Sequence, residues 1–305
     1  MSELSVVVEN LGRKYGNTVA LDGINVSVQK GELFGFIGPD GAGKTSLFRI
    51  LTTLLLPNTG QAKIVGLDVV QDFKKIRNLL GYMPGNFSLY QDLSVEENLN
   101  FFASIFNTTP VQNYHLIKDI YQQIEPFKNR PAGKLSGGMK QKLALSCALI
   151  HKPEVLFLDE PTTGVDAVSR KEFWEMLKKL QNFGITIIVS TPYMDEAGLC
   201  DRVALIEKGQ IMEIDSPQKI QAKFPHQLAA IRSNNMFDII NHLHEMPKLV
   251  SVFRFGDQVH LSFKEGDLNK VEIIDFLEKK GHQTISFKLI EADIEDCFME
   301  LMNKN

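Results

Sequence analysis

Residues 33–56 read LFGFIGPDGAGKTSLFRILTTLLL, and this stretch decides the fold. Its first five residues form an apolar run, which is typical of a strand covered on both faces in a parallel sheet. A glycine-rich turn follows, and the apolar spacing from Thr45 to Leu56 predicts a helix that Pro57 ends. Further buried strands alternate with helices downstream, so the sequence predicts an α/β domain with a largely parallel sheet.

The turn, GPDGAGKT, matches the phosphate-binding loop, a pattern of G-x-x-x-x-G-K followed by Ser or Thr. Glycines let backbone N–H groups curl around phosphate oxygens, and the start of the next helix adds a positive potential. The lysine would neutralise phosphate charge, the threonine would ligate Mg²⁺, and the next serine would help at the α-phosphate. A purely structural turn fits less well, because a buried strand precedes the loop and a helix follows it. We therefore expect nucleotide binding by Gly38, Pro39, Asp40, Gly41, Ala42, Gly43, Lys44, Thr45 and Ser46.

The loop alone does not separate a GTPase from a kinase or an ATPase, but two further segments do. Residues 135–141 read LSGGMKQ before an apolar helix, and residues 155–161 read VLFLDEP about twenty residues later. With the phosphate-binding loop, these segments resemble the nucleotide-binding domain of ABC transporters over roughly residues 1–220. The resemblance implies a P-loop ATPase fold with a mixed-sheet core, an antiparallel β subdomain and a helical subdomain.

The same resemblance implies roles for two carboxylates. Asp159, at the end of a buried strand, would hold Mg²⁺ through water and share the metal site with Thr45. Glu160 would be the general base that polarises the water attacking ATP. Tyr15 lies where the family places an aromatic ring that stacks on adenine, and its alternative is a tyrosine packed at a sheet edge.

The family also works as a head-to-tail dimer with ATP at the interface. By this resemblance, each chain completes the partner's site with a hydroxyl and backbone N–H groups that face the γ-phosphate. The residues that would do so are Ser136, Gly137 and Gly138.

Two positions depart from the family pattern. Gly85 stands where a glutamine usually follows Tyr-x-Pro, and Pro192 stands where a histidine usually follows the strand that ends in Val189-Ser190-Thr191. Neither residue has a side-chain donor for a γ-phosphate. Nearby Asn86, Thr191 and Tyr193 carry polar groups that could substitute. We expect slow but measurable hydrolysis that Glu160→Gln abolishes.

The pattern changes after about residue 225. The order strand, helix, strand, strand, helix, strand, helix resembles a small ferredoxin-like domain. We therefore expect an ABC ATP-binding domain over residues 1–225 and an accessory α+β domain over residues 226–305. The second domain either stabilises the dimer or regulates it.

Composition narrows the class of partner. The chain has 305 residues with a formal net charge of −4, which argues against non-specific nucleic-acid binding. The three cysteines have no metal-ligand spacing, no signal peptide is recognisable, and no apolar run approaches the roughly 18 residues of a membrane helix. We expect a cytoplasmic protein that sits on the inner face of the cell membrane through an integral membrane permease.

Residues 291–298 (EADIEDCF) resemble the ending of export-type ABC ATPases of the drug-resistance and ABC-2 class. The first hypothesis is therefore an ATP-hydrolysing subunit that energises export, as a homodimer or a heterodimer with another ABC ATPase. The second is a degenerate ATP-binding subunit that pairs with a catalytically competent sister. A soluble ABC ATPase acting on ribosomes or DNA ranks last. The residues after Gly85 that could contact the permease, or else pack locally, are Phe87, Leu89, Tyr90 and Leu93.

Overall fold

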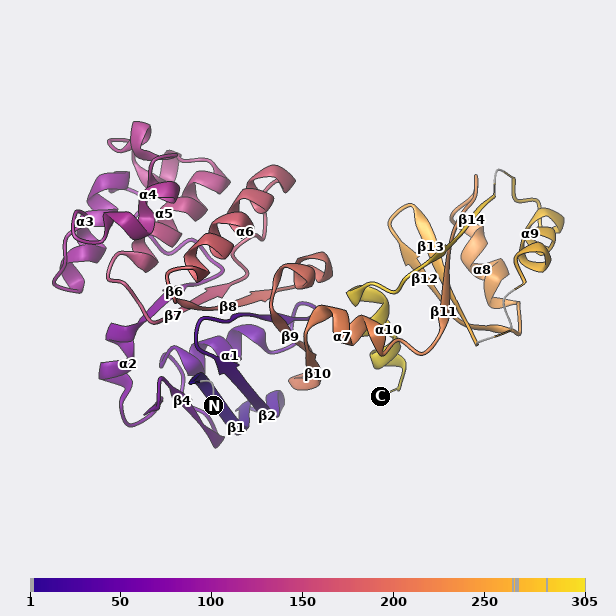
Figure 1. The fold of residues 1–305 in the computed structure, drawn as a ribbon, viewed down its shortest axis with the longest axis horizontal. Helices are drawn as coiled ribbons and strands as arrows, with labels where there is room; N and C mark the ends of the chain where they lie inside the picture. The colour runs from indigo at the N-terminus through magenta and orange to yellow at the C-terminus, as the bar shows by residue number, and fades with distance from the viewer. Residues whose placement is uncertain (1–2, 265, 267–268, 284, 305) are drawn as a thin grey trace. The chain divides into compact units, whose positions relative to one another are not determined.

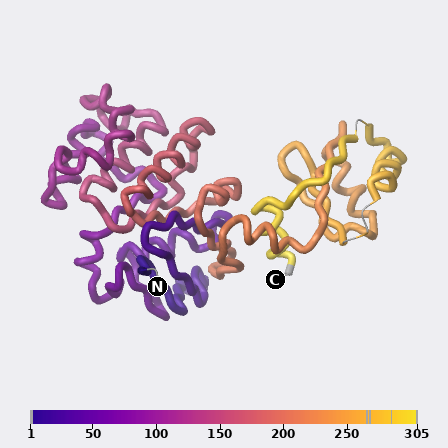
Figure 2. The backbone as a smooth tube through the Cα atoms, viewed as in Figure 1, coloured from indigo at the N-terminus to yellow at the C-terminus, as the bar shows by residue number. Residues whose placement is uncertain are grey.

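The computed structural model describes residues 3–264, 266, 269–283 and 285–304 (Figures 1 and 2). Met1 and Ser2, where any signal peptide would begin, lie outside these residues. The chain forms two compact units, the first ending at Gln218 and the second beginning at Lys219. The boundary expected after residue 225 lies slightly further along the chain, beyond the helix α7 (Pro217–Ala222).

The first unit contains two sheets. The smaller is antiparallel with the order β2-β1-β4-β5, formed by β1 (Leu4–Tyr15), β2 (Thr18–Gln29), β4 (Thr59–Ile64) and β5 (Leu67–Asp68). The larger has the order β10-β9-β3-β8-β7-β6, in which all neighbours pair in parallel except β10 with β9. Its strands are β3 (Leu33–Ile37), β6 (Leu80–Met83), β7 (Val155–Asp159), β8 (Thr186–Thr191), β9 (Arg202–Glu207) and β10 (Gln210–Asp215).

The helices of the first unit are α1 (Lys44–Leu51), α2 (Phe73–Leu79), α3 (Val95–Ile105), α4 (Tyr114–Tyr121), α5 (Gly137–Leu149) and α6 (Ala167–Gln181). Three 3₁₀ helices span Glu125–Phe127, Ala132–Lys134 and Met194–Leu199. Helix α1 ends at Leu51 and not at Leu56 as the apolar spacing predicted. Thr52 caps it by donating its hydroxyl proton to the carbonyl of Phe48, and Thr53 then turns the chain with φ 64°.

One hydrophobic core of the first unit lies between the two sheets, with α1 packed between them. Four phenylalanine rings connect its layers through edge-to-face contacts with centroids 5.2–5.9 Å apart: Phe34, Phe36, Phe48 and Phe157. Because β3 and β7 are buried along their whole length, they fix the loop and the carboxylates that follow them. Helices α3, α4 and α5 pack together as a separate helical part (Figure 1).

The second unit is an α+β domain with a four-stranded antiparallel sheet in the order β12-β13-β11-β14. Its elements are β11 (Gln227–Arg232), α8 (Asp238–His244), β12 (Leu249–Phe255), β13 (Gln258–Phe263), α9 (Lys270–Lys279), β14 (Ser286–Ile290) and α10 (Ile294–Lys304). This chain order and this strand order are those of a ferredoxin-like fold. Helices α8 and α9 share its core with one sheet face. On the other face, His260 hydrogen-bonds Asp296 of α10 at 2.8 Å.

Candidate functional site

The phosphate-binding loop joins β3 to α1, and its glycines are needed for steric reasons. A Cβ at Gly38 would lie 2.0 Å from the carbonyl oxygen of Ile206, and Gly43 has φ 102° with the carbonyl of Ala20 beside it. Gly43 caps α1 with no side-chain hydrogen bond, and the first turn carries no acidic residue. The helix N-terminus is therefore left open to an anion, and its N–H groups suit phosphate oxygens.

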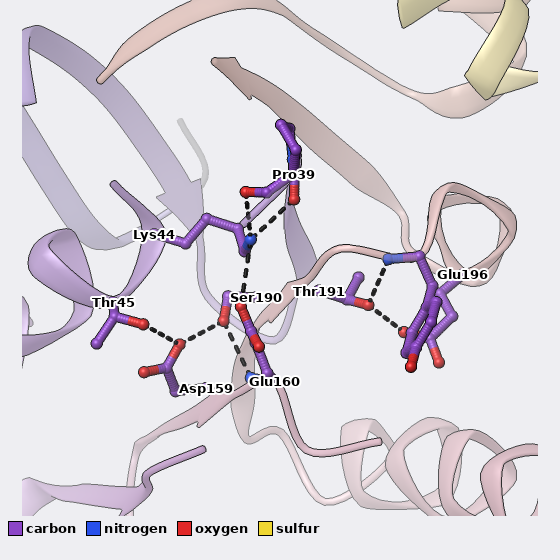
Figure 3. Close-up of polar contacts among 10 residues, drawn as sticks. Pro39, Lys44, Thr45, Asp159, Glu160, Ser190, Thr191 and Glu196 are labelled. Atoms are coloured by element: carbon purple, nitrogen blue, oxygen red, sulfur yellow. Dashed lines mark hydrogen bonds and ion pairs between the residues drawn. The ribbon is translucent and has the colours of Figure 1, made fainter. Parts of the chain in front are cut away.

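Lys44 lies inside this loop with only 3% of its surface exposed. Its Nζ donates hydrogen bonds to the carbonyl oxygens of Gly38 at 2.8 Å and Pro39 at 2.9 Å. The same nitrogen lies 3.2 Å from Oε1 of Glu160, so the ammonium is paired with the carboxylate at the end of β7 (Figure 3). A buried cation held by carbonyls and one carboxylate can exchange these partners for phosphate oxygens.

Thr45 and Asp159 meet although 114 residues separate them. The carboxyl ends of β3, β8 and β7 lie side by side, and Oγ1 of Thr45 donates to Oδ1 of Asp159 at 3.3 Å (Figure 3). A hydroxyl and a carboxylate oxygen are hard ligands of the kind that Mg²⁺ takes beside substrate phosphates. The hydroxyl of Thr45 and the carboxylate of Asp159 therefore fit Mg²⁺ bound together with a nucleotide.

Glu160 follows β7 in a left-handed backbone conformation with φ 50°. Its N–H donates to both the carbonyl and the hydroxyl oxygen of Ser190 in β8, each at 3.0 Å. This turn directs the Glu160 carboxylate towards Lys44. Ser190 also donates to Oδ1 of Asp159 at 2.6 Å. Sequence analysis missed Ser190; the available signal was a polar residue at the carboxyl end of a buried strand.

The two departures from the family pattern lie at different places around this site. Gly85 borders it, since a Cβ there would lie 3.1 Å from the carbonyl oxygen of Asp159. The Thr191 hydroxyl, a candidate substitute beside Pro192, already donates to buried Glu196 and accepts from the N–H of Tyr193.

Other groups also engage the segment after β8. Glu196 additionally accepts a hydrogen bond from Thr162 at 2.8 Å. The Tyr193 ring lies under the Arg170 guanidinium at 4.9 Å. Asn86, the third candidate substitute, is exposed and lines a groove beside the site.

Tyr15 ends β1 beside the start of α1. Its hydroxyl lies 3.3 Å from Oγ of Ser46, and the Arg13 guanidinium lies 4.8 Å from its ring centroid. The side chain is exposed at 43%, so one part of the ring is open for stacking. The geometry therefore places an aromatic surface next to the serine expected at the α-phosphate.

Ser136, Gly137 and Gly138 lie at the start of α5, in the helical part of the unit. Ser136 caps this helix by accepting from the N–H of Met139 at 3.4 Å. A Cβ on Gly138 would lie 2.9 Å from Oγ of Ser169, near the start of α6. None of the contacts described for these residues joins them to the phosphate-binding loop of the same chain. Asp166 caps α6, and the N–H of Ser169 lowers the pKa of its carboxyl.

A groove of about 610 Å³ runs from Gly85 to the helical part. Its walls include Phe87, Phe102, Phe106, Lys140, Cys147 and His151. His151 donates from Nε2 to the carbonyl of Leu80 at 3.0 Å and stacks on Phe106, and burial lowers its pKa. Burial also raises the pKa of the Cys147 thiol. The groove is therefore mostly apolar, and its lining includes the cationic side chain of Lys140.

The residues expected to contact a permease do not all face this groove. Phe87 and Leu89 line it, and Lys140 lies 5.3 Å from the Phe87 ring centroid. Tyr90 is 51% exposed and packs edge-to-face on Phe101 of α3. Leu93 is half-buried just before that helix. None of the helices in the part of the chain that the structure describes is long and apolar enough to cross a bilayer.

Several known proteins are similar to this chain. A family model described as ABC transporter matches residues 21–163. The probable multidrug ABC transporter ATP-binding protein YbhF of Escherichia coli (strain K12) is 38% identical over 223 residues, or 72% of this chain. The chain spans 39% of the length of that relative.

Two further proteins are similar over most of their own length. The solved structure of cbiO1 from Clostridium perfringens, titled as part of the ABC transporter complex cbiONQ, has a TM-score of 0.65 at 28% identity. The structural match covers 72% of this chain and 92% of the cbiO1 chain. The Nod factor export ATP-binding protein I of Burkholderia lata is 31% identical over 306 residues, which cover 97% of this chain and 96% of that protein. Since this similarity extends almost from end to end and includes the phosphate-binding loop, the chain belongs to the family of ABC transporter ATP-binding proteins.

Proposed function

We propose that this chain is an ATP-binding and ATP-hydrolysing subunit that energises export through a separate membrane permease. The observation that carries the proposal is the convergence of four side chains at the start of α1 and the end of β7. Lys44 lies 3.2 Å from Glu160, and Thr45 lies 3.3 Å from Asp159. Relatives named for multidrug transport and Nod factor export support the exporter class.

Each of these side chains has a defined task at a triphosphate. Lys44 leaves its carbonyl and carboxylate partners to bind β- and γ-phosphate oxygens. The backbone N–H groups at the start of α1 bind the other phosphate oxygens of ATP. Thr45 and Asp159 would hold Mg²⁺, which supplies charge neutralisation when it is bound. Glu160, released from Lys44, orients the attacking water and accepts its proton. Tyr15 stacks on the adenine ring.

The start of α5 supports a dimer. A Cβ on Gly138 would lie 2.9 Å from Oγ of Ser169 in α6, and Ser136 caps α5 itself. None of the contacts described for this segment joins it to the phosphate-binding loop of its own chain. In a head-to-tail dimer Ser136, Gly137 and Gly138 complete the partner's site with a hydroxyl and helix N-terminal N–H groups. Because binding of a second protomer then needs ATP, nucleotide shifts the population towards the closed pair. The partner copy is an identical chain or another ABC ATPase.

The groove beside Gly85 supports a permease partner. Its apolar wall suits a short amphipathic helix of an integral membrane protein, and it borders the carbonyl of Asp159 through Gly85. Such a contact would keep the chain at the inner face of the membrane and connect the hydrolytic site to the permease. In this proposal the first unit carries ATP, and the second unit is an accessory domain.

The experiment that tests this proposal compares the parent chain with Glu160→Gln. We expect the parent to hydrolyse Mg-ATP and the variant to lose at least about a hundredfold in turnover. ATP affinity should be retained, because glutamine removes the base but leaves Lys44 free to bind phosphate. Glu175→Gln on the exposed side of α6 is the matched control and should hydrolyse at the parent's rate. Equal turnover by parent and Glu160→Gln would refute the assignment of the base.

A second candidate function is a degenerate subunit that holds ATP while a sister ATPase hydrolyses its own. Gly85 and Pro192 offer no donor, and the Thr191 hydroxyl beside Pro192 is engaged by Glu196. The same measurement separates the candidates. A parent chain that binds ATP with micromolar affinity yet shows no turnover supports the degenerate subunit, whereas turnover by the purified chain excludes it.

A further inference from the structure

We propose that Ser190 is a positioning residue for hydrolysis, through which β8 orients both carboxylates at the end of β7. This inference rests on the proposed hydrolytic function of the site. Ser190 would not touch ATP; it acts through the side chain of Asp159 and the backbone of Glu160.

The Ser190 hydroxyl makes one hydrogen bond to each of these residues. It donates to Oδ1 of Asp159 at 2.6 Å and accepts from the N–H of Glu160 at 3.0 Å (Figure 3). A serine hydroxyl has one proton to donate, so donation to Asp159 also fixes which lone pairs face Glu160. The hydroxyl therefore joins the metal-site carboxylate and the base in one geometry.

Asp159 receives its two side-chain donors on the same oxygen. Thr45 and Ser190 both bond Oδ1, at 3.3 and 2.6 Å, from opposite neighbouring elements, α1 and β8. Two donors on one oxygen set the rotation of the carboxylate plane. When Thr45 turns to a bound Mg²⁺, the bond from Ser190 is the one that continues to hold Asp159.

Glu160 needs a backbone anchor as well. Its φ of 50° is a left-handed conformation, which is unfavourable for a residue other than glycine. The Ser190 carbonyl and hydroxyl oxygens both accept from its N–H. Ser190→Ala removes only the hydroxyl and keeps the carbonyl bond, so the turn can persist while the carboxylate of Asp159 loses its fixed orientation.

The Ser190 hydroxyl is a buried polar group that is hydrogen-bonded. Ser190 is fully buried, in a strand whose six residues are all buried. Its neighbours across the sheet are Phe36 in β3 and Asp159 in β7. A polar group at such a position is stable only when it is hydrogen-bonded, and here both of its partners belong to the end of β7.

The chain supplies a matched control on the same strand. Thr186 at the other end of β8 is also fully buried, and its hydroxyl contacts Ser5 at 2.8 Å and the N–H of Gly31 at 3.0 Å. Thr186→Val therefore removes a buried hydroxyl far along the strand from Asp159. A role confined to stability predicts similar behaviour for Thr186→Val and Ser190→Ala.

The test measures hydrolysis, thermal unfolding and binding of a fluorescent ATP analogue with Mg²⁺ or with EDTA. For Ser190→Ala we expect turnover and the Mg²⁺-dependent gain in affinity to fall about 10–100-fold, with affinity in EDTA unchanged. Ser190→Thr, which keeps the hydroxyl, should recover most of both. Thr186→Val should lower only the unfolding temperature. If Ser190→Ala does not fold, Ser190→Cys, which keeps the size but weakens the donor, takes its place.

The outcomes separate this inference from the proposed function. If the parent hydrolyses ATP, the role of Ser190 alone is overturned by either of two results. These results are that Ser190→Ala matches the parent, or that it matches Thr186→Val, in turnover and in the Mg²⁺-dependent gain in affinity. If the parent does not hydrolyse ATP, the hydrolytic function is overturned. If Ser190→Ala then still shows the full Mg²⁺-dependent gain in affinity, the role of Ser190 is overturned as well. A parent that binds no Mg-nucleotide overturns both.

Discussion

At the scale of single residues, the site is defined by contacts that the sequence does not reveal. Lys44 belongs to a loop pattern that predicts phosphate binding, but its pairing with Glu160 joins residues more than a hundred positions apart. In this structure Lys44 and Glu160, proposed as the cation for phosphate and the base for water, neutralise each other. In the proposed function, nucleotide binding breaks this ion pair, which both occupies Lys44 and frees Glu160.

Lys44→Ala tests the first half of this exchange. We expect ATP affinity to fall at least about tenfold, because a charge-assisted hydrogen bond to phosphate contributes roughly 1.5–3 kcal/mol. Equilibrium binding of a fluorescent ATP analogue measures the effect. Lys30→Ala, which removes an exposed lysine paired with Glu3, is the control and should bind as the parent does. Unchanged affinity in Lys44→Ala would show that the nucleotide binds elsewhere.

At the scale of elements, α5 and β6 are joined by a histidine that is sensitive to pH. His151 follows α5 and donates to the carbonyl of Leu80 at the start of β6. Its Nδ1 is buried and has no hydrogen-bond partner among the residues that the structure describes. Burial lowers its pKa below the ordinary value of 6.5. The unfolded chain therefore takes up a proton at His151 more readily than the folded chain.

The sign of the effect follows from this difference. A histidine with a depressed pKa contributes stability above pH 6.5, and that contribution is lost as the pH falls below 6.5 towards the folded pKa. His151→Gln keeps a donor for Leu80 but cannot titrate. We expect its urea midpoint to fall less between pH 7 and pH 5 than that of the parent. His115→Gln changes an exposed histidine and should follow the parent, so a parallel fall in all three proteins would contradict this role of His151.

The sequence predicted most elements and missed what depends on their neighbours. The apolar runs correctly marked β3, β7 and β8, because strands buried on both faces have few polar residues. Helix α1 ended early because Thr52 capped its last turn, a local competition that apolar spacing ignores. The sequence did not predict the contacts of Ser190 and Glu196 with residues at and after the end of β7. These contacts depend on the strand order β3-β8-β7, which is set by crossovers that a linear pattern does not show.

At the scale of the whole molecule, the described residues of each unit include a hydrophobic core of their own. One surrounds α1 between the sheets of the first unit, and it contains Phe48, which is fully buried. The other lies between the sheet and the helices α8 and α9 of the second unit, and it contains Leu261. The loop that fits phosphate belongs to the first core alone, so nucleotide binding and the stability of the second core should be separable.

This separation predicts two unfolding transitions in the full chain. Leu261→Ala should lower one of them, because emptying a core leucine site costs about 2–5 kcal/mol, and should leave ATP affinity unchanged. Phe48→Ala should lower the other by a similar amount or more. A ligand that binds one folded unit stabilises that unit by mass action, so Mg-ATP should raise only the transition that Phe48→Ala lowers. Differential scanning calorimetry of the parent and both variants, each with and without Mg-ATP, measures this. A single transition that shifts as a whole in both variants would show that the two cores unfold as one.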